Sequence, residues 1–126
     1  MSAEPEVWLF SYGTLRHREV QLTIFGHAVE GRPDALPGYS VSAVRLTDAT
    51  VIAASGTAEH IIVKRTDNPR DEVPGMVLRI NQTDLAAADA YEPAEYKRAL
   101  VRLRSGIEAY VYVDSRQDDN RLTGPE

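Results

Sequence analysis

The stretch Val-Trp-Leu-Phe-Ser-Tyr-Gly-Thr-Leu, residues 7–15, decides how we expect this chain to fold. Residues 7–11 form an apolar run with the length and composition of a buried β-strand. Gly13 follows, and a glycine allows the backbone to bend sharply. A basic segment ending at Arg18 then indicates the start of a helix. Free backbone N–H groups at such a turn can bind an anion, so residues 12–15 are a candidate binding loop.

The composition indicates one globular domain. The chain has 126 residues, of which 43% are hydrophobic, with 8 glycines and 7 prolines. A chain of this length can bury most of the apolar surface that a single core needs. We expect one domain over residues 1–126, with its core within residues 7–114 and a flexible polar tail at 115–126.

Charge and residue counts exclude several classes of function. The net charge of −5 argues against a nucleic-acid partner, because phosphate binding needs a basic face. The absence of cysteine excludes disulfides and thiolate chemistry, and the three histidines show no metal-binding spacing. No phosphate-loop, dinucleotide or serine-hydrolase motif is present, so no cofactor or metal is expected.

Targeting signals are also missing from the sequence. No apolar run approaches the ~20 residues needed to cross a bilayer. The acidic N-terminus lacks the basic and apolar regions of a signal peptide. We therefore expect a cytoplasmic protein that does not act at a membrane.

Apolar periodicity and turn residues predict an α+β fold. One helix is expected over Arg18–Phe25, with Val20, Leu22, Ile24 and Phe25 as its apolar contacts and Gly26 closing it. A second is expected over residues 83–92, capped by Asn81 and stopped by Pro93. Strands are expected at 27–32, 39–46, 60–64, 73–80, 99–104 and 107–114, the last two joined by a two-residue turn, Ser105-Gly106. Residues 47–57 show no clear pattern. The result is a mixed sheet that curls into a partial β-barrel, with two main helices.

Glu92 is the leading candidate for chemistry. It follows Leu85 and Ala88 at helical spacings of seven and four residues, which places its carboxylate on the inward face of the second helix. Burial and the negative end of the helix dipole both favour the neutral acid and raise its pKa. Such a group can accept and return a proton near cellular pH. The competing interpretation is that Glu92 ends a surface helix with its side chain in water.

Three neighbours of Glu92 have open roles. Asp89 also falls on the inward face and can pair with an arginine, a structural role that we favour over a catalytic one. Tyr96 and Arg98 can hold a substrate carboxylate or orient the acid. A core tyrosine and an exposed arginine are equally good interpretations of these two positions.

Two segments together resemble the gamma-glutamylcyclotransferase-like family. The first is Tyr12-Gly13-Thr14-Leu15 after the first strand, and the second is Asp89, Tyr91, Glu92, Tyr96 and Arg98 at the end of the second helix. A third segment, Val73-Pro74-Gly75, precedes the apolar residues Met76-Val77-Leu78 and is similar to the Val-x-Gly strand of the family. Pro93 departs from the family's usual glycine, and residues 47–57 have no familiar match.

The resemblance implies an intramolecular acyl transfer that releases 5-oxoproline from a small γ-glutamyl amine, amide or dipeptide. It implies that Glu92 is the catalytic acid and base. Substrate binding is then expected at Tyr12, Gly13, Thr14, Leu15, Tyr96 and Arg98. The alternative is a binding or regulatory domain that keeps the pocket without turnover.

Overall fold

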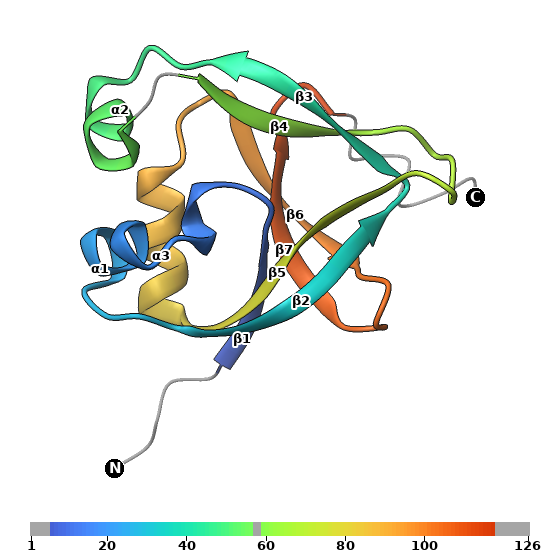
Figure 1. The fold of residues 1–126 in the computed structure, drawn as a ribbon, viewed down its shortest axis with the longest axis horizontal. Coiled ribbons are helices and arrows are strands. Elements are labelled where there is room, and N and C mark those ends of the chain that lie inside the picture. Colours follow the sequence, from blue (N-terminus) through green and yellow to red (C-terminus); the bar gives the residue numbers. More distant parts are fainter. Residues whose placement is uncertain (1–5, 57–58, 118–126) are drawn as a thin grey trace.

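The computed structural model describes residues 6–56 and 59–117 (Figure 1). Seven strands, three α-helices and one 3₁₀ helix follow one another in these residues. Their order is β1 (Glu6–Ser11), η1 (Thr14–Arg16), α1 (Arg18–Phe25), β2 (Glu30–Pro37), β3 (Tyr39–Arg45), α2 (Ala49–Ser55), β4 (Glu59–Arg65), β5 (Glu72–Asn81), α3 (Gln82–Tyr91), β6 (Tyr96–Arg102) and β7 (Glu108–Asp114).

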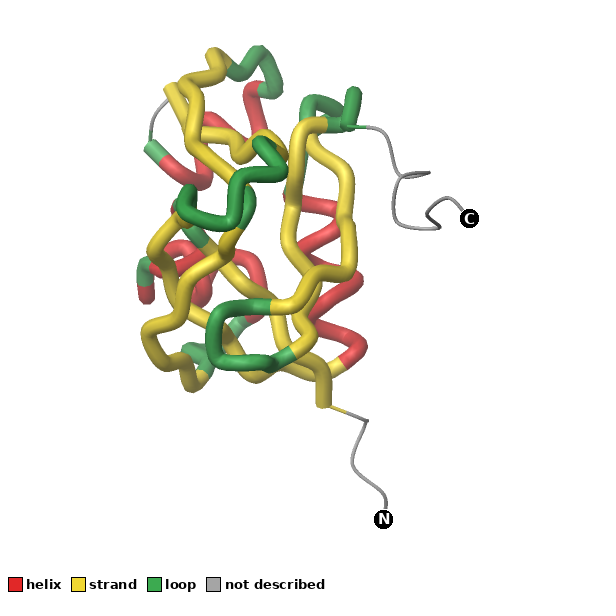
Figure 2. The backbone as a smooth tube through the Cα atoms, turned by 90° about the vertical axis from the view of Figure 1, so that its right-hand side faces the viewer, coloured by secondary structure: helices red, strands yellow, loops and turns green. Residues whose placement is uncertain are grey.

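A five-stranded mixed sheet forms the centre of the molecule, in the order β2-β5-β1-β7-β6. Strand β1 runs antiparallel to β5 and parallel to β7, while β3 and β4 form a separate antiparallel pair. The helices gather on one side of the strands (Figures 1 and 2). The predicted α+β class with a mixed sheet is confirmed, and the sheet stays open rather than closing into a barrel.

Strand β1 is central and is buried on both of its faces. Leu9 belongs to a core cluster shared with α1 and α3, while Phe10 belongs to a second cluster on the opposite face. Both side chains are at most 1% exposed. Successive strand residues point to opposite faces, so a strand covered on both sides needs an uninterrupted apolar run. This is why residues 7–10 are apolar without alternation.

The two predicted helices form close to the expected positions. Helix α1 has the expected bounds and ends at Gly26, whose φ of 80° lies in the left-handed region that glycine tolerates. Its contacts differ at one position, because Leu22 is 44% exposed rather than packed. Helix α3 begins with a capping box between Asn81 and Asp84. It ends before Pro93, as the steric conflict between proline and a preceding helical residue requires.

The structure corrects three details of the sequence prediction. Helix α2 fills the segment that had no assignment, with the Asp48 side chain accepting from Thr50 N and Val51 N as its N-cap. Strand β2 lies several residues later than predicted, and its prolines are tolerated because it is an edge strand. The β6–β7 connection spans residues 103–107 rather than two residues, and it is closed by hydrogen bonds from Leu103 N to Ile107 O at 2.8 Å and from Gly106 N to Leu103 O at 2.9 Å.

The predicted flexible tail lies outside the described residues from position 118 onward. No helix within residues 6–56 or 59–117 has the length and apolar character needed to span a membrane.

Candidate functional site

A cavity of about 210 Å³ opens where the end of β1 meets the C-terminal end of α3. These two ends come together because α3 packs on the sheet face that contains Leu9, through Leu85 and Ala88. The cavity therefore joins the two sequence segments that were singled out above. The residues that line it are Phe10, Ser11, Tyr12, Gly13, Thr14, Leu15, Arg16, His17, His60, Ile61, Glu92, Tyr96 and Tyr112.

The loop after β1 is anchored at both ends. The Tyr12 hydroxyl is buried and donates to the Tyr112 carbonyl at 2.6 Å. Leu15 is 3% exposed, and its carbonyl accepts from the side-chain amide of Gln21 at 2.9 Å. Between these anchors Gly13 and Thr14 remain half-buried and line the cavity. The loop is thus held rigidly while its middle faces open space.

Backbone donors gather in this loop. Two hydrogen bonds close η1, from Arg16 N to Gly13 O at 3.2 Å and from His17 N to Thr14 O at 2.9 Å. The N–H groups of Thr14 and Leu15 precede them and have no acceptor within the helix. Such groups can hydrogen-bond an oxyanion or a carboxylate.

Gly13 serves the loop differently from the sequence expectation. Its φ is −126°, so the bend does not depend on a left-handed conformation. Instead, a Cβ at this position would meet no heavy atom within 4 Å. The glycine therefore leaves space beside the backbone on a residue that lines the cavity.

Glu92 caps the C-terminus of α3 and lines the same cavity as the loop. Its backbone N–H still donates to Ala88 O at 3.0 Å, while its ψ of 129° is the extended value expected before proline. Burial raises the pKa of the Glu92 carboxyl to about 8, and the negative charge of Asp89 adds to the rise. The side chain is half-buried in the cavity wall, which disagrees with the interpretation of a frayed end in water.

Asp89 holds a position behind Glu92 through two hydrogen bonds of 2.7 Å. It accepts from Arg98 Nη1 and from the Tyr112 hydroxyl. The predicted arginine pairing is confirmed, but the inward orientation is wrong, because the Asp89 side chain is 42% exposed. Arg98 also stacks over the Tyr110 ring at 4.7 Å and does not line the cavity. The structure therefore brings Arg98 to Asp89 and not to the candidate site.

Tyr96 does line the cavity. It is half-buried, and its hydroxyl donates to the Ile61 carbonyl at 2.9 Å. Burial and the nearby Glu92 raise the pKa of the Tyr96 phenol, so it stays neutral and acts as a hydrogen-bond donor. This contact connects the turn after α3 to β4.

Sequence reasoning gave no role of their own to two further residues near the cavity. Tyr91 does not line the cavity, but its hydroxyl bonds Thr14 Oγ1, which does, at 3.0 Å. His60 lines the cavity, and its Nε2 lies 2.9 Å from Ser55 Oγ. Tyr91 lies within the motif quoted from the end of the second helix, so the sequence itself pointed to this residue. The sequence did not point to His60, because its position in the cavity wall depends on how α2 and β4 meet at the cavity.

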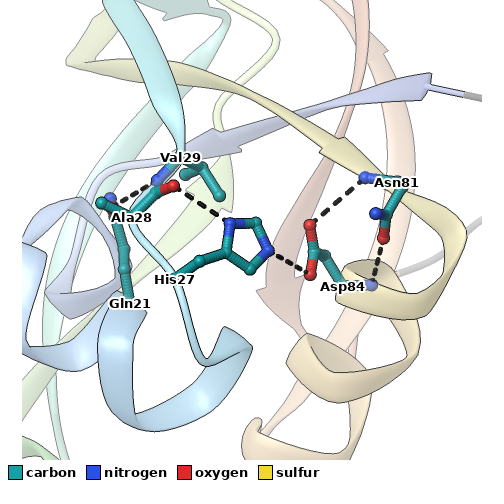
Figure 3. Close-up of polar contacts among 6 residues, drawn as sticks. All are labelled: Gln21, His27, Ala28, Val29, Asn81 and Asp84. Carbon is teal, nitrogen blue, oxygen red and sulfur yellow. Dashed lines mark hydrogen bonds and ion pairs between the residues drawn. The ribbon is translucent and has the colours of Figure 1, made fainter.

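A second network positions the elements that carry the site (Figure 3). Gln21 on α1 donates to Leu15 O and accepts from Val29 N at 3.1 Å. In the same region His27 Nε2 lies 3.0 Å from an Asp84 carboxylate oxygen at the start of α3. The Asp84 partner and the Ala28 carbonyl raise the pKa of His27. This network connects the loop after β1, helix α1 and the segment that follows it, and the N-terminal end of α3.

A metal centre is not visible in this arrangement. Residues 6–56 and 59–117 contain no group of three or more His, Cys, Asp or Glu side chains able to hold an ion together. The described residues of the cavity instead offer a carboxyl group with a raised pKa and the backbone donors of the loop.

Comparison with known proteins gives one family. Residues 9–125 match the family model described as "Gamma-glutamyl cyclotransferase, AIG2-like". None of the curated proteins matches the sequence significantly.

Several solved structures share the fold. One is a gamma-glutamyl cyclotransferase, with a TM-score of 0.68 and 17% identity over 90% of this chain and 69% of its own. A human protein described as uncharacterized gives 0.67 and 20% identity, over 91% and 70% of the two chains. A protein from Arabidopsis thaliana, solved in solution, gives 0.65 and 20% identity, over 100% and 73%.

Proposed function

Because the chain belongs to the gamma-glutamyl cyclotransferase, AIG2-like family, we propose that it releases 5-oxoproline and a free amine from a γ-glutamyl amine, amide or dipeptide. The observation that carries this proposal is the position of Glu92. A carboxyl group with its pKa raised to about 8 shares one cavity with the backbone donors of the loop after β1. A proton acceptor and an oxyanion site in one cavity are the two parts that an intramolecular acyl transfer needs.

Proton transfer is assigned to Glu92. The substrate's α-ammonium gives one proton to the Glu92 carboxylate, and the free amine attacks the γ-carbonyl carbon of the same molecule. The new C–N bond closes a five-membered ring, and the C–N bond to the leaving amine then breaks. Protonated Glu92 returns its proton to the leaving nitrogen. The ring nitrogen still carries two protons after the attack, so it gives one to the regenerated carboxylate, which passes it to the departing amine. The products are 5-oxoproline and an ammonium, and the Glu92 carboxylate is regenerated. A pKa near the working pH suits a group that must accept and donate in turn.

The loop is assigned to binding and charge stabilisation. The N–H groups of Thr14 and Leu15 are proposed to bind the oxyanion that forms at the γ-carbonyl. Gly13 provides room beside them, and buried Tyr12 fixes the start of the loop. Tyr96 is proposed to contact the substrate in the cavity, where its hydroxyl, which already donates to Ile61 O, can accept a hydrogen bond from a substrate N–H. Ring closure is favourable because nucleophile and carbonyl already belong to one molecule.

These steps use only acid–base chemistry, so we propose a reaction without a cofactor. We also propose that the protein acts in the cytoplasm on a small molecule. Arg98 is not proposed as a substrate ligand, since it is bound to Asp89 outside the cavity.

Glu92→Gln tests the proposal. The change keeps the shape of the side chain but removes the proton acceptor, so we expect release of 5-oxoproline to fall by at least about a hundredfold. The measurement is mass spectrometry of 5-oxoproline from a panel of γ-glutamyl amines, amides and dipeptides. Glu95→Gln is the control, because Glu95 lies nearby and does not line the cavity. Full activity of the Glu92 variant would refute the assigned role.

A binding or regulatory domain predicts a different result on the same panel. The wild-type protein would bind members of the panel without releasing 5-oxoproline above the rate without protein. Ligand-observed NMR on each compound separates that result from a panel that contains no ligand.

A further inference from the structure

Arg16 places a fixed positive charge at the cavity. It is the last residue of η1, directly after the loop, and it lines the cavity wall. Its Nε donates to Gly13 O at 3.0 Å, which ties the side chain back onto the loop that it follows. Arg16 is exposed, but this bond holds its guanidinium beside the backbone donors of the loop.

This charge has no counterion in the described part of the chain. Within residues 6–56 and 59–117, Arg16 makes no ion pair, whereas Arg98 is bonded to Asp89 at 2.7 Å. Among the described residues that line the cavity, Glu92 is the sole carboxylate. Because burial raises the pKa of Glu92 to about 8, that carboxyl is mostly neutral at pH 7. The cavity is thus positive where Arg16 borders it.

The chemistry of the guanidinium indicates what it binds. Arginine carries five N–H donors in a planar fork that matches a carboxylate. The bond from Nε to Gly13 O uses one donor and leaves the two terminal nitrogens with theirs. We propose that Arg16 binds a carboxylate of the substrate and is the charged anchor of the site. This inference rests on the proposed function and assigns to Arg16 the role that sequence reasoning gave to Arg98.

Two carboxylates of a γ-glutamyl dipeptide have this chemistry. One is the α-carboxylate of the glutamyl group, and the other belongs to the leaving amino acid. Substrates that lack one or the other distinguish them: a dipeptide whose glutamyl α-carboxylate is amidated, and a γ-glutamyl alkylamine whose leaving group carries no charge.

The first experiment compares Arg16→Ala with Arg18→Ala on these three substrates. Arg18 is an exposed arginine two residues later that does not line the cavity, so it is a matched control. On the intact dipeptide we expect Arg16→Ala to raise KM by about tenfold or more, with kcat changed much less. Arg18→Ala should leave both values near those of the wild type. Arg16→Lys should recover part of the loss, because it keeps the charge without the fork.

The substrate on which the loss disappears identifies the carboxylate that Arg16 binds. If amidation of the α-carboxylate makes wild type and Arg16→Ala equal, that group is the partner. If the alkylamine does so, the partner is the leaving group's carboxylate. An equal loss on all three substrates, or no loss on the dipeptide, would overturn the inference.

A second experiment separates this inference from the proposed function. Binding of the two products, 5-oxoproline and the free amino acid, is measured by NMR titration of the protein and of Arg16→Ala and Arg18→Ala. A weakening of about tenfold for Arg16→Ala alone, with either product, supports the anchor, even if the panel reveals no turnover. Equal affinity of all three proteins for both products, or no binding of either product to the wild type, overturns it, even if Glu92 proves to be catalytic.

Discussion

Gly75 shows how a single residue allows the candidate site to form. It lies in β5 behind the loop, and a Cβ there would come within 2.5 Å of the Ser11 carbonyl oxygen and 2.7 Å of the Phe10 ring. Ser11 ends β1 and pairs with Met76, so its carbonyl cannot move without disturbing the ladder. Gly13 differs, because a Cβ there would meet nothing within 4 Å. Gly75 is thus required because a side chain would clash between β1 and β5. Gly13 is required because a side chain would fill the space beside the loop.

Alanine at these two glycines should have opposite effects. Gly75→Ala is expected to destabilise the fold by roughly 1–3 kcal/mol or more, because it overpacks a buried strand pair. Gly13→Ala is expected to change stability by less than about 0.5 kcal/mol, since its Cβ meets no atom. It should nevertheless reduce turnover by about tenfold or more, because the methyl group occupies space where the substrate approaches. Urea denaturation and the 5-oxoproline assay measure the two effects.

The opposite pattern would argue against this division of roles. A stable Gly75→Ala protein would mean that β1 and β5 can separate at no cost. A fully active Gly13→Ala protein would place the substrate away from the loop.

At the level of elements, local signals predicted most of the fold. Helix α1, the caps of α3 and strand β5 follow from residues that act within a few positions, such as Gly26, Asn81 and Pro93. Strand β2 was misplaced because its prolines are acceptable only at a sheet edge, which is a property of the topology. The β6–β7 turn forms at Gly106, whose φ is 95°, but the loop is longer than two residues because the ladder ends at the pair Arg102 and Glu108.

The candidate site was predictable to the extent that it is local. Glu92 was found from helical spacing, and residues 12–15 were found from a strand followed by a glycine turn. The role expected for Arg98 was not supported, because its partner Asp89 is set by how α3 packs on β6 and β7. Arg16 and His60 were overlooked as cavity residues for the same reason. Tertiary contacts decide which positively charged side chains face a cavity, and the spacing of residues along the sequence does not reveal these contacts.

The contact between His27 and Asp84 joins two elements and should make their attachment depend on pH. Because Asp84 raises the pKa of His27, this contact stabilises the fold below about pH 6.5, the unfolded value. The contribution is lost as the pH rises through the higher folded value. We expect His27→Ala to cost about 0.5–1 kcal/mol at pH 6 and less at pH 9. Denaturant unfolding at the two pH values is the measurement.

His17→Ala is the matched control for this prediction. His17 is also exposed, and its side chain makes no capping bond to α1. We expect its substitution to have a small effect that is the same at both pH values. A cost for His27→Ala that does not change with pH would show that the ion pair adds nothing beyond the neutral hydrogen bond.

Charged groups across the whole molecule make both stability and activity depend on pH. From about pH 5 to 9 we expect the free energy of unfolding to fall while the activity rises. The pKa of Asp114 is lowered to about 2, chiefly by hydrogen bonds from Arg116, so its contribution is present above about pH 3.9 and lost in stronger acid. Glu92 behaves in the reverse way. Its folded pKa of about 8 exceeds the unfolded value of about 4.3, so the folded protein holds an extra proton between these values. The free energy of unfolding therefore falls as the pH rises through that range, and His27 adds to the decline.

Glu92→Gln should remove most of this decline in stability together with the activity. Wild-type kcat/KM is expected to rise with pH, reach half of its maximum near pH 8 and level off above it, as the Glu92 carboxylate forms. Over the same range the wild-type free energy of unfolding should fall by a few kcal/mol, because a buried carboxylate must become charged. Glutamine carries no charge at any pH, so the variant should be roughly 2–4 kcal/mol more stable than the wild type at pH 9, relative to their difference at pH 5. Denaturant unfolding of both proteins from pH 5 to 9 measures this difference. Parallel curves would mean that Glu92 titrates at the same pH in the folded and unfolded protein, which would leave the cavity without the tuned acid that the proposed reaction needs.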